Sequence, residues 1–392
     1  MSRRTRLDVA VVGGGVVGSA AALALARLGL DVALLETREP PRWTSGARDL
    51  RVYAFAPDNA ALLASLGAWD AVRAARVQPY RRMRVWDAAG DGELAFDADR
   101  LGVRELGWIV EHGLLVDRLW SALRGAGVQV RCPAGVVALE PHDDGARLRL
   151  EDGTTVDARL VLGADGAASS VRTLAGIQTE AHDYGQRGIV GFVASERPHA
   201  ETAWQRFLPG GPLALLPFAD GDSSIVWTLP DADAARVAAL DDEAFGRELT
   251  AASGGRLGAL RATSPRAAFP LRRQLAATHA EGRVLLLGDA AHVVHPLAGQ
   301  GVNLGLRDVS ALVEIVREAR ARQADYAAPQ RLARWARARR SENAVAAHAF
   351  GAINRAFSND DFVATLLRGP LLGLAARLPP LARAFWRHAA GT

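Results

Sequence analysis

The sequence predicts an α/β protein in which a doubly wound domain is interrupted by a mostly antiparallel β-sheet domain and followed by a helical C-terminal tail. Two observations carry this prediction. Residues 7–36 have the pattern of a strand, a glycine-rich turn, a helix and a second strand, which is a βαβ unit. Residues 180–275 alternate between apolar and polar positions and contain clusters of turn-forming residues, which is typical of antiparallel sheets.

Each element of the doubly wound domain has its own signal. LDVAVV at 7–12 and DVALLE at 31–36 are short apolar runs that predict buried strands. The segment SAAALALARLG between them consists of good helix formers and ends at Gly29. Two later apolar runs, 158–165 and 282–289, each end in an acidic residue at a glycine turn. Further helical patterns cover residues 302–322 and 327–350.

Composition narrows the class of protein. The 392 residues are 49% hydrophobic and 23% charged, as in ordinary globular proteins large enough for two domains. All 47 basic residues are Arg, and they are scattered, so the sequence predicts no nucleic-acid partner. A single cysteine excludes an intramolecular disulfide and favours a reducing, cytoplasmic compartment. The sequence lacks the spacings of metal ligands, so no metal is expected. It also lacks a run of the roughly 18 apolar residues that a membrane-spanning helix needs.

The first glycine turn has the spacing of a dinucleotide-binding motif. Gly13 allows the tight turn, Gly15 lets backbone approach a pyrophosphate, and Gly18 lets the helix pack on the strand. The helix N-terminus then faces the anion, and Val17 belongs to the same binding segment. Glu36 follows 18 residues after Gly18, at the end of the next strand, where a carboxylate accepts from a ribose hydroxyl. This motif alone does not distinguish NAD from FAD.

Two further motifs make that distinction. GADGAASSVR at 163–172 and RVLLLGDAAHVVHPLAGQGVNLGLRD at 283–308, together with DLRVYAF and RFLPGGPLALLPF, resemble the flavin monooxygenases with the para-hydroxybenzoate hydroxylase fold. Within that family the chain is most similar, over nearly its whole length, to the ubiquinone-biosynthesis hydroxylases. The resemblance implies FAD as cofactor, NADPH or NADH and O2 as co-substrates, and a polyprenyl phenol or quinol as substrate. It also implies hydroxylation of the aromatic ring through a flavin C4a-hydroperoxide.

With that resemblance, the domains are predicted as follows. The FAD-binding domain is discontinuous, the sheet domain binds substrate, and the tail is helical. The FAD-binding domain is predicted to comprise residues 1–79, 101–180 and 276–345. The substrate-binding sheet domain comprises 80–100 and 181–275, and the helical tail comprises 346–392.

The third motif carries most of the predicted cofactor residues. Gly288 and Asp289 follow a buried strand, at the carboxyl end of the sheet where ligands bind. The resemblance implies that Asp289 binds the ribityl chain, and a helix N-cap is the alternative. Pro296 stiffens the turn that follows, and Gly299 allows backbone to lie against a ring. Gly301, Val302 and Asn303 then open a helix whose N-terminal dipole favours the reduced flavin anion.

Other cofactor residues rest on the resemblance alone. These are Arg51, Arg118 and Asp165. The alternative to cofactor binding is an ordinary surface arginine for Arg118 and an ordinary turn aspartate for Asp165. Many relatives have Asn-Arg where this chain has His112-Gly113, so the role of that helix is left open.

No residue is predicted to be an obligatory catalytic base, because in this family the flavin carries the oxygen and the substrate ring is the nucleophile. His295 and Pro296 are predicted to position the flavin edge. His292 and His295 also have a spacing that two metal ligands on one helix would share, but packing or flavin positioning is the favoured interpretation.

Substrate binding has two sequence candidates. Six aromatic and apolar residues of the sheet domain are expected either to line a substrate pocket or to form the core of the sheet, and the core is the favoured interpretation. They are Trp204, Phe207, Leu215, Pro217, Phe218 and Trp227. Residues 362–392 hold four arginines and no acidic residue among many leucines. These residues are expected either to cover the FAD-binding domain or to contact a membrane surface, a lipid carrier or a ubiquinone-synthesis complex. The protein is therefore expected in the cytoplasm, with a peripheral location at the inner membrane if the tail contacts the membrane.

Two alternative functions remain at this point. One is a hydroxylase of a soluble aromatic compound. The other is a non-catalytic assembly subunit that retains the fold, which the intact glycine motifs disfavour.

Overall fold

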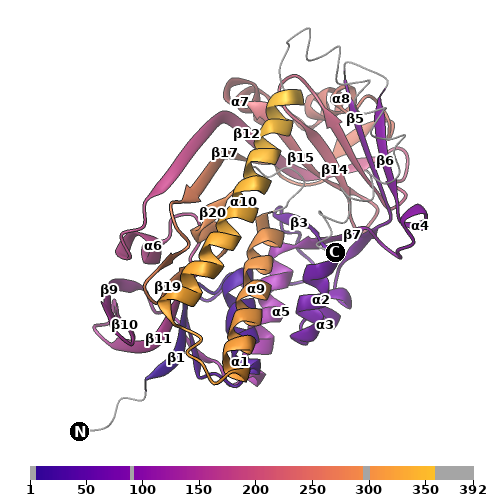
Figure 1. The fold of residues 1–392 in the computed structure, drawn as a ribbon. Coiled ribbons are helices and arrows are strands. Elements are labelled where there is room, and N and C mark those ends of the chain that lie inside the picture. The colour runs from indigo at the N-terminus through magenta and orange to yellow at the C-terminus, as the bar shows by residue number, and fades with distance from the viewer. Residues whose placement is uncertain (1–5, 89–91, 295–300, 358–392) are drawn as a thin grey trace.

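The computed structural model describes residues 6–88, 92–294 and 301–357, with side chains up to residue 345, and it contains two large sheets that lie one above the other (Figure 1). The predicted α/β fold class is confirmed. The lower sheet holds the βαβ unit, and the upper sheet holds the antiparallel segment. Long helices flank the lower sheet, and the longest of them runs upward beside the other sheet (Figure 1).

The lower sheet has eight strands, and its centre is parallel. Its main path is β18-β19-β11-β1-β2-β8, in which only β18 is antiparallel, and β9 and β10 extend it through β11. The bounds are β1 Leu7–Val12, β2 Val32–Leu35, β8 Gln129–Arg131, β9 Val136–His142, β10 Gly145–Leu150, β11 Thr155–Gly163, β18 Ala280–Glu281 and β19 Val284–Leu286. The apolar runs expected at 7–12, 31–36, 158–165 and 282–289 therefore supply the four adjacent strands at the centre of this sheet.

Helices cover one face of this sheet and form its larger core. Helix α1 (Val16–Arg27) packs against α5 (His112–Gly125) and α9 (Gly301–Ala321). Alanines and leucines of α1 are fully buried between these partners, which explains why this helix has so little polar surface. Helix α10 (Pro329–Phe357) packs on α9 and reaches β18, and the short α6 (Ser170–Leu174) lies against β9 on the other face.

The upper sheet has nine strands in the order β20-β17-β12-β15-β14-β13-β5-β6, with β16 beside β12. Every pair is antiparallel except β13 with β5. Helices α7 (Asp231–Ala238) and α8 (Asp242–Ala252) cover one face. The strand bounds are β5 Arg82–Asp87, β6 Glu93–Asp97, β12 Thr179–Ser195, β13 Thr202–Phe207, β14 Leu213–Pro217, β15 Ser223–Pro230, β16 Leu260–Ala262, β17 Ala267–Ala276 and β20 His292–Val293.

A small third sheet, which the sequence analysis did not predict, joins the two large ones. Its order is β3-β7-β4, with bounds Val52–Phe55, Gly107–Glu111 and Gln78–Tyr80. Strand β7 runs directly into α5, and β4 directly precedes β5 of the upper sheet. Helix α2 (Pro57–Ser65) follows β3 and packs on α9, α3 (Trp69–Arg73) packs on α5, and α4 (Ala98–Leu101) contacts β6 of the upper sheet. The strands of the small sheet share a buried cluster with the upper sheet, and this cluster connects the two halves of the molecule.

The helical C-terminal region continues as α10 to Phe357. The segment 362–392, for which a membrane or partner contact was considered, lies outside the described residues. Within the described part of the chain, no helix is both long enough and apolar enough to span a membrane.

Candidate functional site

A pocket of about 410 Å³ opens at the carboxyl ends of the parallel strands β1, β2 and β11. This volume lies within the usual range of small-molecule sites. All three glycine motifs contribute to its lining, and we call it the glycine-motif pocket. Among the predicted cofactor residues, its walls contain Gly13, Gly15, Val17, Glu36, Arg51, Asp165, Asp289 and Val302. The structure thus brings together residues that are up to 289 positions apart, counted from Gly13 to Val302.

Gly13 and Gly18 are required by close packing. Gly13 has φ +103°, and a Cβ there would lie 2.4 Å from the Ala164 carbonyl oxygen, so another residue would be strained and would clash. A Cβ on Gly18 would lie 1.9 Å from the Gly13 carbonyl oxygen. These two glycines let β1, β11 and α1 converge closely at one end of the pocket.

Gly15 is different, because a Cβ built on it meets nothing within 4 Å. Gly15 is the N-cap of α1, and the first turn of that helix contains no acidic residue. The unpaired N–H groups of a helix N-terminus attract anions, and here they open onto the pocket. A side chain at Gly15 would fill this cradle. The arrangement therefore fits the diphosphate of a dinucleotide.

Glu36 lies beside the same turn. Its carboxylate accepts hydrogen bonds from the backbone N–H groups of Gly14 at 2.5 Å and Thr37 at 2.7 Å. Backbone donors on both sides hold the carboxylate in one orientation at the end of β2. It lines the pocket in the position expected for a ribose-binding group, and that role stays a prediction.

At the other end of the pocket, Gly288 and Asp289 form a short 3-10 turn after β19. Gly288 has φ +57°, and a Cβ there would approach the Val17 side chain at 3.2 Å. Asp289 Oδ2 lies 3.9 Å from an Arg51 guanidinium nitrogen, and both side chains remain partly exposed to the pocket. Helix α9 begins only at Gly301, so Asp289 is not its N-cap.

Two predicted cofactor residues have their side chains engaged elsewhere. Arg118 pairs with Asp117 at 2.6 Å and lies over the Trp43 ring at 5.6 Å, outside the pocket lining. The adjacent carboxylate and the indole ring explain this position. The fully buried Asn303 side chain accepts from the Ala56 N–H and donates to the Ala54 carbonyl, so it ties α9 to β3 and α2.

Asp165 lies in the pocket wall and also organises the local turn. Its carboxylate accepts from the hydroxyl groups of Ser169 and Ser170 and from the Val171 N–H. The turn-aspartate interpretation therefore describes its contacts within the chain, while its place in the wall leaves a cofactor role as a prediction.

His292 is part of a buried ionic cluster. Its Nε2 lies 2.6 Å from Asp308 Oδ2, and both side chains are fully buried. In the described part of the chain, no group of three or more His, Cys, Asp or Glu residues is arranged to hold a metal ion. His295, Pro296 and Gly299 fall outside the described residues.

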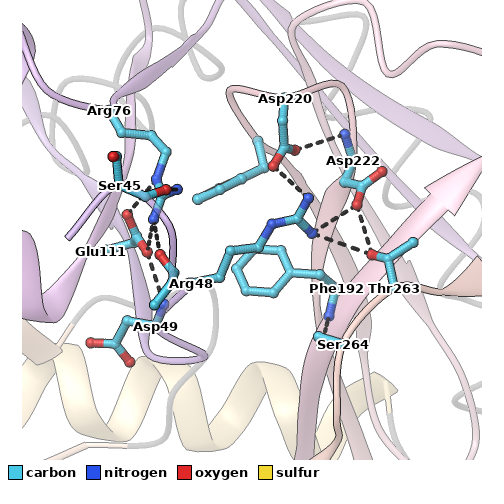
Figure 2. Close-up of polar contacts among 12 residues, drawn as sticks. Ser45, Arg48, Asp49, Arg76, Glu111, Phe192, Asp220, Asp222, Thr263 and Ser264 are labelled. Carbon is cyan, nitrogen blue, oxygen red and sulfur yellow. Dashed lines mark hydrogen bonds and ion pairs between the residues drawn. The ribbon is translucent and has the colours of Figure 1, made fainter.

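The sequence analysis missed a group of arginines that anchor the loop leading to Arg51. Figure 2 shows Arg48 extending to Asp220 and Asp222 of the upper-sheet half, with nitrogen–oxygen distances of 2.5 and 2.8 Å. On the other side, Arg76 makes two 2.8 Å hydrogen bonds to the fully buried carboxylate of Glu111. The spacing of these residues along the chain gives no signal for either contact.

The apolar residues of the upper sheet divide between its two faces. Leu215, Trp227 and the partly buried Trp204 pack in the cluster beneath α7 and α8. Phe218, with Phe192, belongs to the cluster shared with the small sheet. The favoured interpretation of a sheet core holds for both groups, because Phe218 is also fully buried. The face with Phe218 is the one turned toward the pocket-bearing half.

Comparison with known proteins identifies the family of this chain. A family model described as an FAD binding domain matches residues 6–346. The chain belongs to this family. The flavin resemblance, the FAD cofactor and the enzyme class of FAD-dependent monooxygenase are confirmed by this match and by the relatives below.

The relatives cover nearly the whole chain. A 3-demethoxyubiquinol 3-hydroxylase of Escherichia coli strain K12 is 37% identical, with 98% of each chain covered. A ubiquinone hydroxylase, UbiL, of Rhodospirillum rubrum is 39% identical, with 98% of this chain and 90% of the relative covered. Among solved structures, p-nitrophenol 4-monooxygenase PnpA of Pseudomonas putida DLL-E4 has a TM-score of 0.78 at 20% identity, with 98% of each chain covered. That likeness concerns the fold.

Proposed function

We propose that this FAD-dependent monooxygenase hydroxylates the aromatic ring of a polyprenylated phenol or quinol in ubiquinone biosynthesis, with NADPH or NADH and O2 as co-substrates. The observation that carries the proposal is the match, over 98% of this chain, to two relatives named as hydroxylases of ubiquinone or its precursor. When bound, FAD supplies electron transfer from the nicotinamide and the activation of O2.

The chain's own residues bind and orient. The N-terminus of α1, opened by Gly15, holds the diphosphate, and Glu36 holds the ribose at the adenosine end. Asp289 accepts from hydroxyl groups of the ribityl chain at the other end. Phe192 and Phe218 are buried in the cluster that joins the upper sheet to the small sheet, and the aromatic ring of the substrate is proposed to bind beside that cluster.

A finer proposal concerns partners. The arginine-rich, acid-free composition of residues 362–392 supports contact with an anionic membrane surface or a carrier of the lipid substrate. Flotation with anionic vesicles, compared between the full chain and a chain ending at Asp361, tests this contact.

The proposed reaction is tested by deleting the gene and identifying the quinone intermediate that accumulates. We expect a polyprenylated precursor that lacks one ring hydroxyl group, and we expect the wild-type gene to remove it. Gly15→Leu should neither restore hydroxylation nor bind FAD, because its side chain would occupy the diphosphate cradle. Flavin absorbance of the purified variant provides the second measurement.

Each alternative function predicts a different result. A hydroxylase of a soluble aromatic compound would leave the quinone pool of the deletion strain unchanged. If the protein were an assembly subunit, the Gly15→Leu variant would restore hydroxylation in the deletion strain although it binds no flavin. Either result would refute the proposal.

A further inference from the structure

Helix α10 has a buried side and an exposed side. The buried side packs on α9 and β18, and its residues are Leu332, Trp335, Ala336, Arg339 and Asn343. The exposed side carries three arginines at intervals of three residues, Arg334, Arg337 and Arg340. Residues with this spacing lie on successive turns of a helix, so the three guanidinium groups form one basic face. Figure 1 shows α10 running along the outside of the molecule past both large sheets.

The arginines of this basic face differ from exposed arginines on neighbouring surface helices. Those on α7, α8 and α9 each form an ion pair with a glutamate, and the pairs are Arg236–Glu248, Arg247–Glu243 and Arg317–Glu314. Within the part of the chain that the structure describes, none of the three arginines of the basic face pairs with a carboxylate. Their charges are therefore not neutralised by the fold.

The carboxylates nearest to the basic face along the chain are already engaged. Asp325, before α10, pairs with Arg159 and Arg283. Glu342, on α10 itself, pairs with the buried Arg339. Glu281 of β18, the strand that α10 contacts, is exposed and forms no ion pair with the basic face among the described residues. Three unpaired positive charges thus face solvent, with one unpaired carboxylate on the neighbouring strand.

We propose that the basic face of α10 binds the anionic headgroups of a membrane surface. A guanidinium group donates several hydrogen bonds in a planar fork, which suits the phosphate oxygens of lipid headgroups. Ala338 is exposed on the same side of the helix, and Val345 adds an apolar side chain that is 63% exposed. A helix side that combines arginines with apolar groups is typical of contact with an anionic lipid surface.

The choice of a lipid surface over another polyanion rests on the proposed function, because a polyprenylated substrate resides in a lipid phase. The sequence beyond this helix agrees with the choice, since residues 362–392 hold four arginines, many leucines and no acidic residue. The basic face would add a second contact, within the described fold, to the one proposed for that segment. It would hold α10, and both sheets beside it, in one orientation on the membrane.

The test measures how the full-length protein partitions onto vesicles of phosphatidylcholine with and without the anionic phosphatidylglycerol. We expect the triple variant Arg334→Gln, Arg337→Gln and Arg340→Gln to bind the anionic vesicles about 100-fold more weakly than the wild type. Each arginine at an anionic surface contributes about fivefold to binding. Added salt should release the wild-type protein, because it screens the attraction. On vesicles of phosphatidylcholine alone, the two proteins should bind equally weakly.

The matched control removes the same number of positive charges from other surfaces. It combines Arg124→Gln, Arg147→Gln and Arg247→Gln, at exposed arginines that pair with Glu39, Asp157 and Glu243. The control should bind anionic vesicles like the wild type. Both triple variants should keep the flavin absorbance and melting temperature of the wild type, since all the replaced side chains are exposed. If the triple variant of the basic face does not fold, the three single variants decide, each with an expected loss of about fivefold.

Three results would overturn the proposal. The first is that the wild-type protein does not bind anionic vesicles, which would leave an acidic protein as the partner of the basic face. The second is unchanged binding in the triple variant, which would leave the contact to residues 362–392 alone. The third is an equal loss in the matched control, which would show that only net charge matters. Vesicle binding involves no catalysis, so a failed test of hydroxylation is recognised separately from a failure of this contact.

Discussion

Asp289 illustrates how one residue is prepared for a ligand and contributes little to the stability of the fold. It follows a buried strand, and its turn is held by Gly288 in a left-handed conformation. Its side chain remains 39% exposed, and its ion-pair partner Arg51 is 3.9 Å away and 58% exposed. A pair that is so open to solvent adds little to stability. We therefore expect the contribution of Asp289 to appear in cofactor affinity.

Asp289→Ala should weaken FAD binding by about 10- to 150-fold, because loss of a charge-assisted hydrogen bond costs roughly 1.5 to 3 kcal/mol. The melting temperature of the flavin-free protein should hardly change. Fluorescence titration with FAD and thermal denaturation measure the two effects. Asp144→Ala, at a side chain that is 78% exposed, is the matched control and should change neither. A lower melting temperature with normal FAD affinity would assign Asp289 a structural role.

At the scale of elements, the Gly288–Asp289 turn is attached to α9 and α10 by one buried carboxylate. Asp308 Oδ2 accepts from the Gly288 N–H at 3.1 Å and from His292 Nε2 at 2.6 Å. Asp308 Oδ1 accepts from Arg339 Nε on α10 at 2.8 Å. Burial alone would raise the pKa of Asp308, but His292 and Arg339 outweigh burial and hold it below its usual range. Asp308 therefore stays ionised and connects the turn, α9 and α10 behind the pocket.

Asp308→Asn should lower the free energy of unfolding by about 3 kcal/mol, at the lower end of the usual range for breaking a buried ion pair, because the buried Arg339 guanidinium keeps only the largely exposed Glu342 carboxylate as a counter-charge. Chemical denaturation measures this change. The control is Asp58→Asn, which breaks the partly exposed ion pair between Asp58 and Arg307, a neighbour of Asp308 on α9. This substitution should lower the free energy of unfolding by about 0 to 1 kcal/mol. Equal effects of the two substitutions would refute a special role for the buried cluster.

The same carboxylate predicts a pH dependence. Since the folded pKa of Asp308 is depressed, the unfolded chain binds the proton first as the pH falls below about 4. The stability that Asp308 contributes is thus present above about pH 4 and lost below it, and Asp308→Asn should lack that loss. His279, whose pKa burial lowers to about 4, adds a separate acid loss that begins near pH 6.5 in both proteins. Denaturation midpoints measured from pH 7 to pH 3 would distinguish the two contributions.

The elements that could be predicted from the sequence are those with strong local patterns. Gly13, Gly15 and Glu36 were predicted correctly as neighbours because a βαβ unit brings its first turn and second strand together within 30 residues. The small third sheet was missed because its strands have only three to five residues, too few to show a period. The contact from Asp308 to Arg339 spans 31 residues and two helices, and no local pattern encodes it. Arg118 could not be placed either, since its position depends on Trp43, which is 75 residues earlier in the chain.

At the scale of the whole molecule, the two halves meet where the loop before β3 crosses to the upper sheet. Arg48 forms the link, because its guanidinium pairs with Asp220 and Asp222 and lies 5.1 Å from the centre of the Phe192 ring. The same loop continues into Arg51, which lines the pocket, so the contact with the upper sheet and the position of a predicted cofactor residue depend on one short segment. Arg76 and Glu111 anchor the near side of this loop through a buried ion pair.

Arg48→Met should therefore affect both stability and FAD binding. Methionine keeps the apolar contact with Phe192 but loses the two ion pairs and the cation–π contact, so we expect the free energy of unfolding to fall by about 1 to 2 kcal/mol. Because the Arg48 side chain is 28% exposed, solvent screening limits the loss. FAD affinity should fall about two- to fivefold as Arg51 loses its support, an energy below about 1 kcal/mol. Arg124→Met, at a side chain that is 64% exposed and 3.8 Å from Glu39, is the matched control and should leave both quantities unchanged. Denaturation of the flavin-free protein and FAD titration give the two measurements. A stable Arg48→Met variant with normal FAD affinity would mean that Arg76 and Glu111 alone hold the loop.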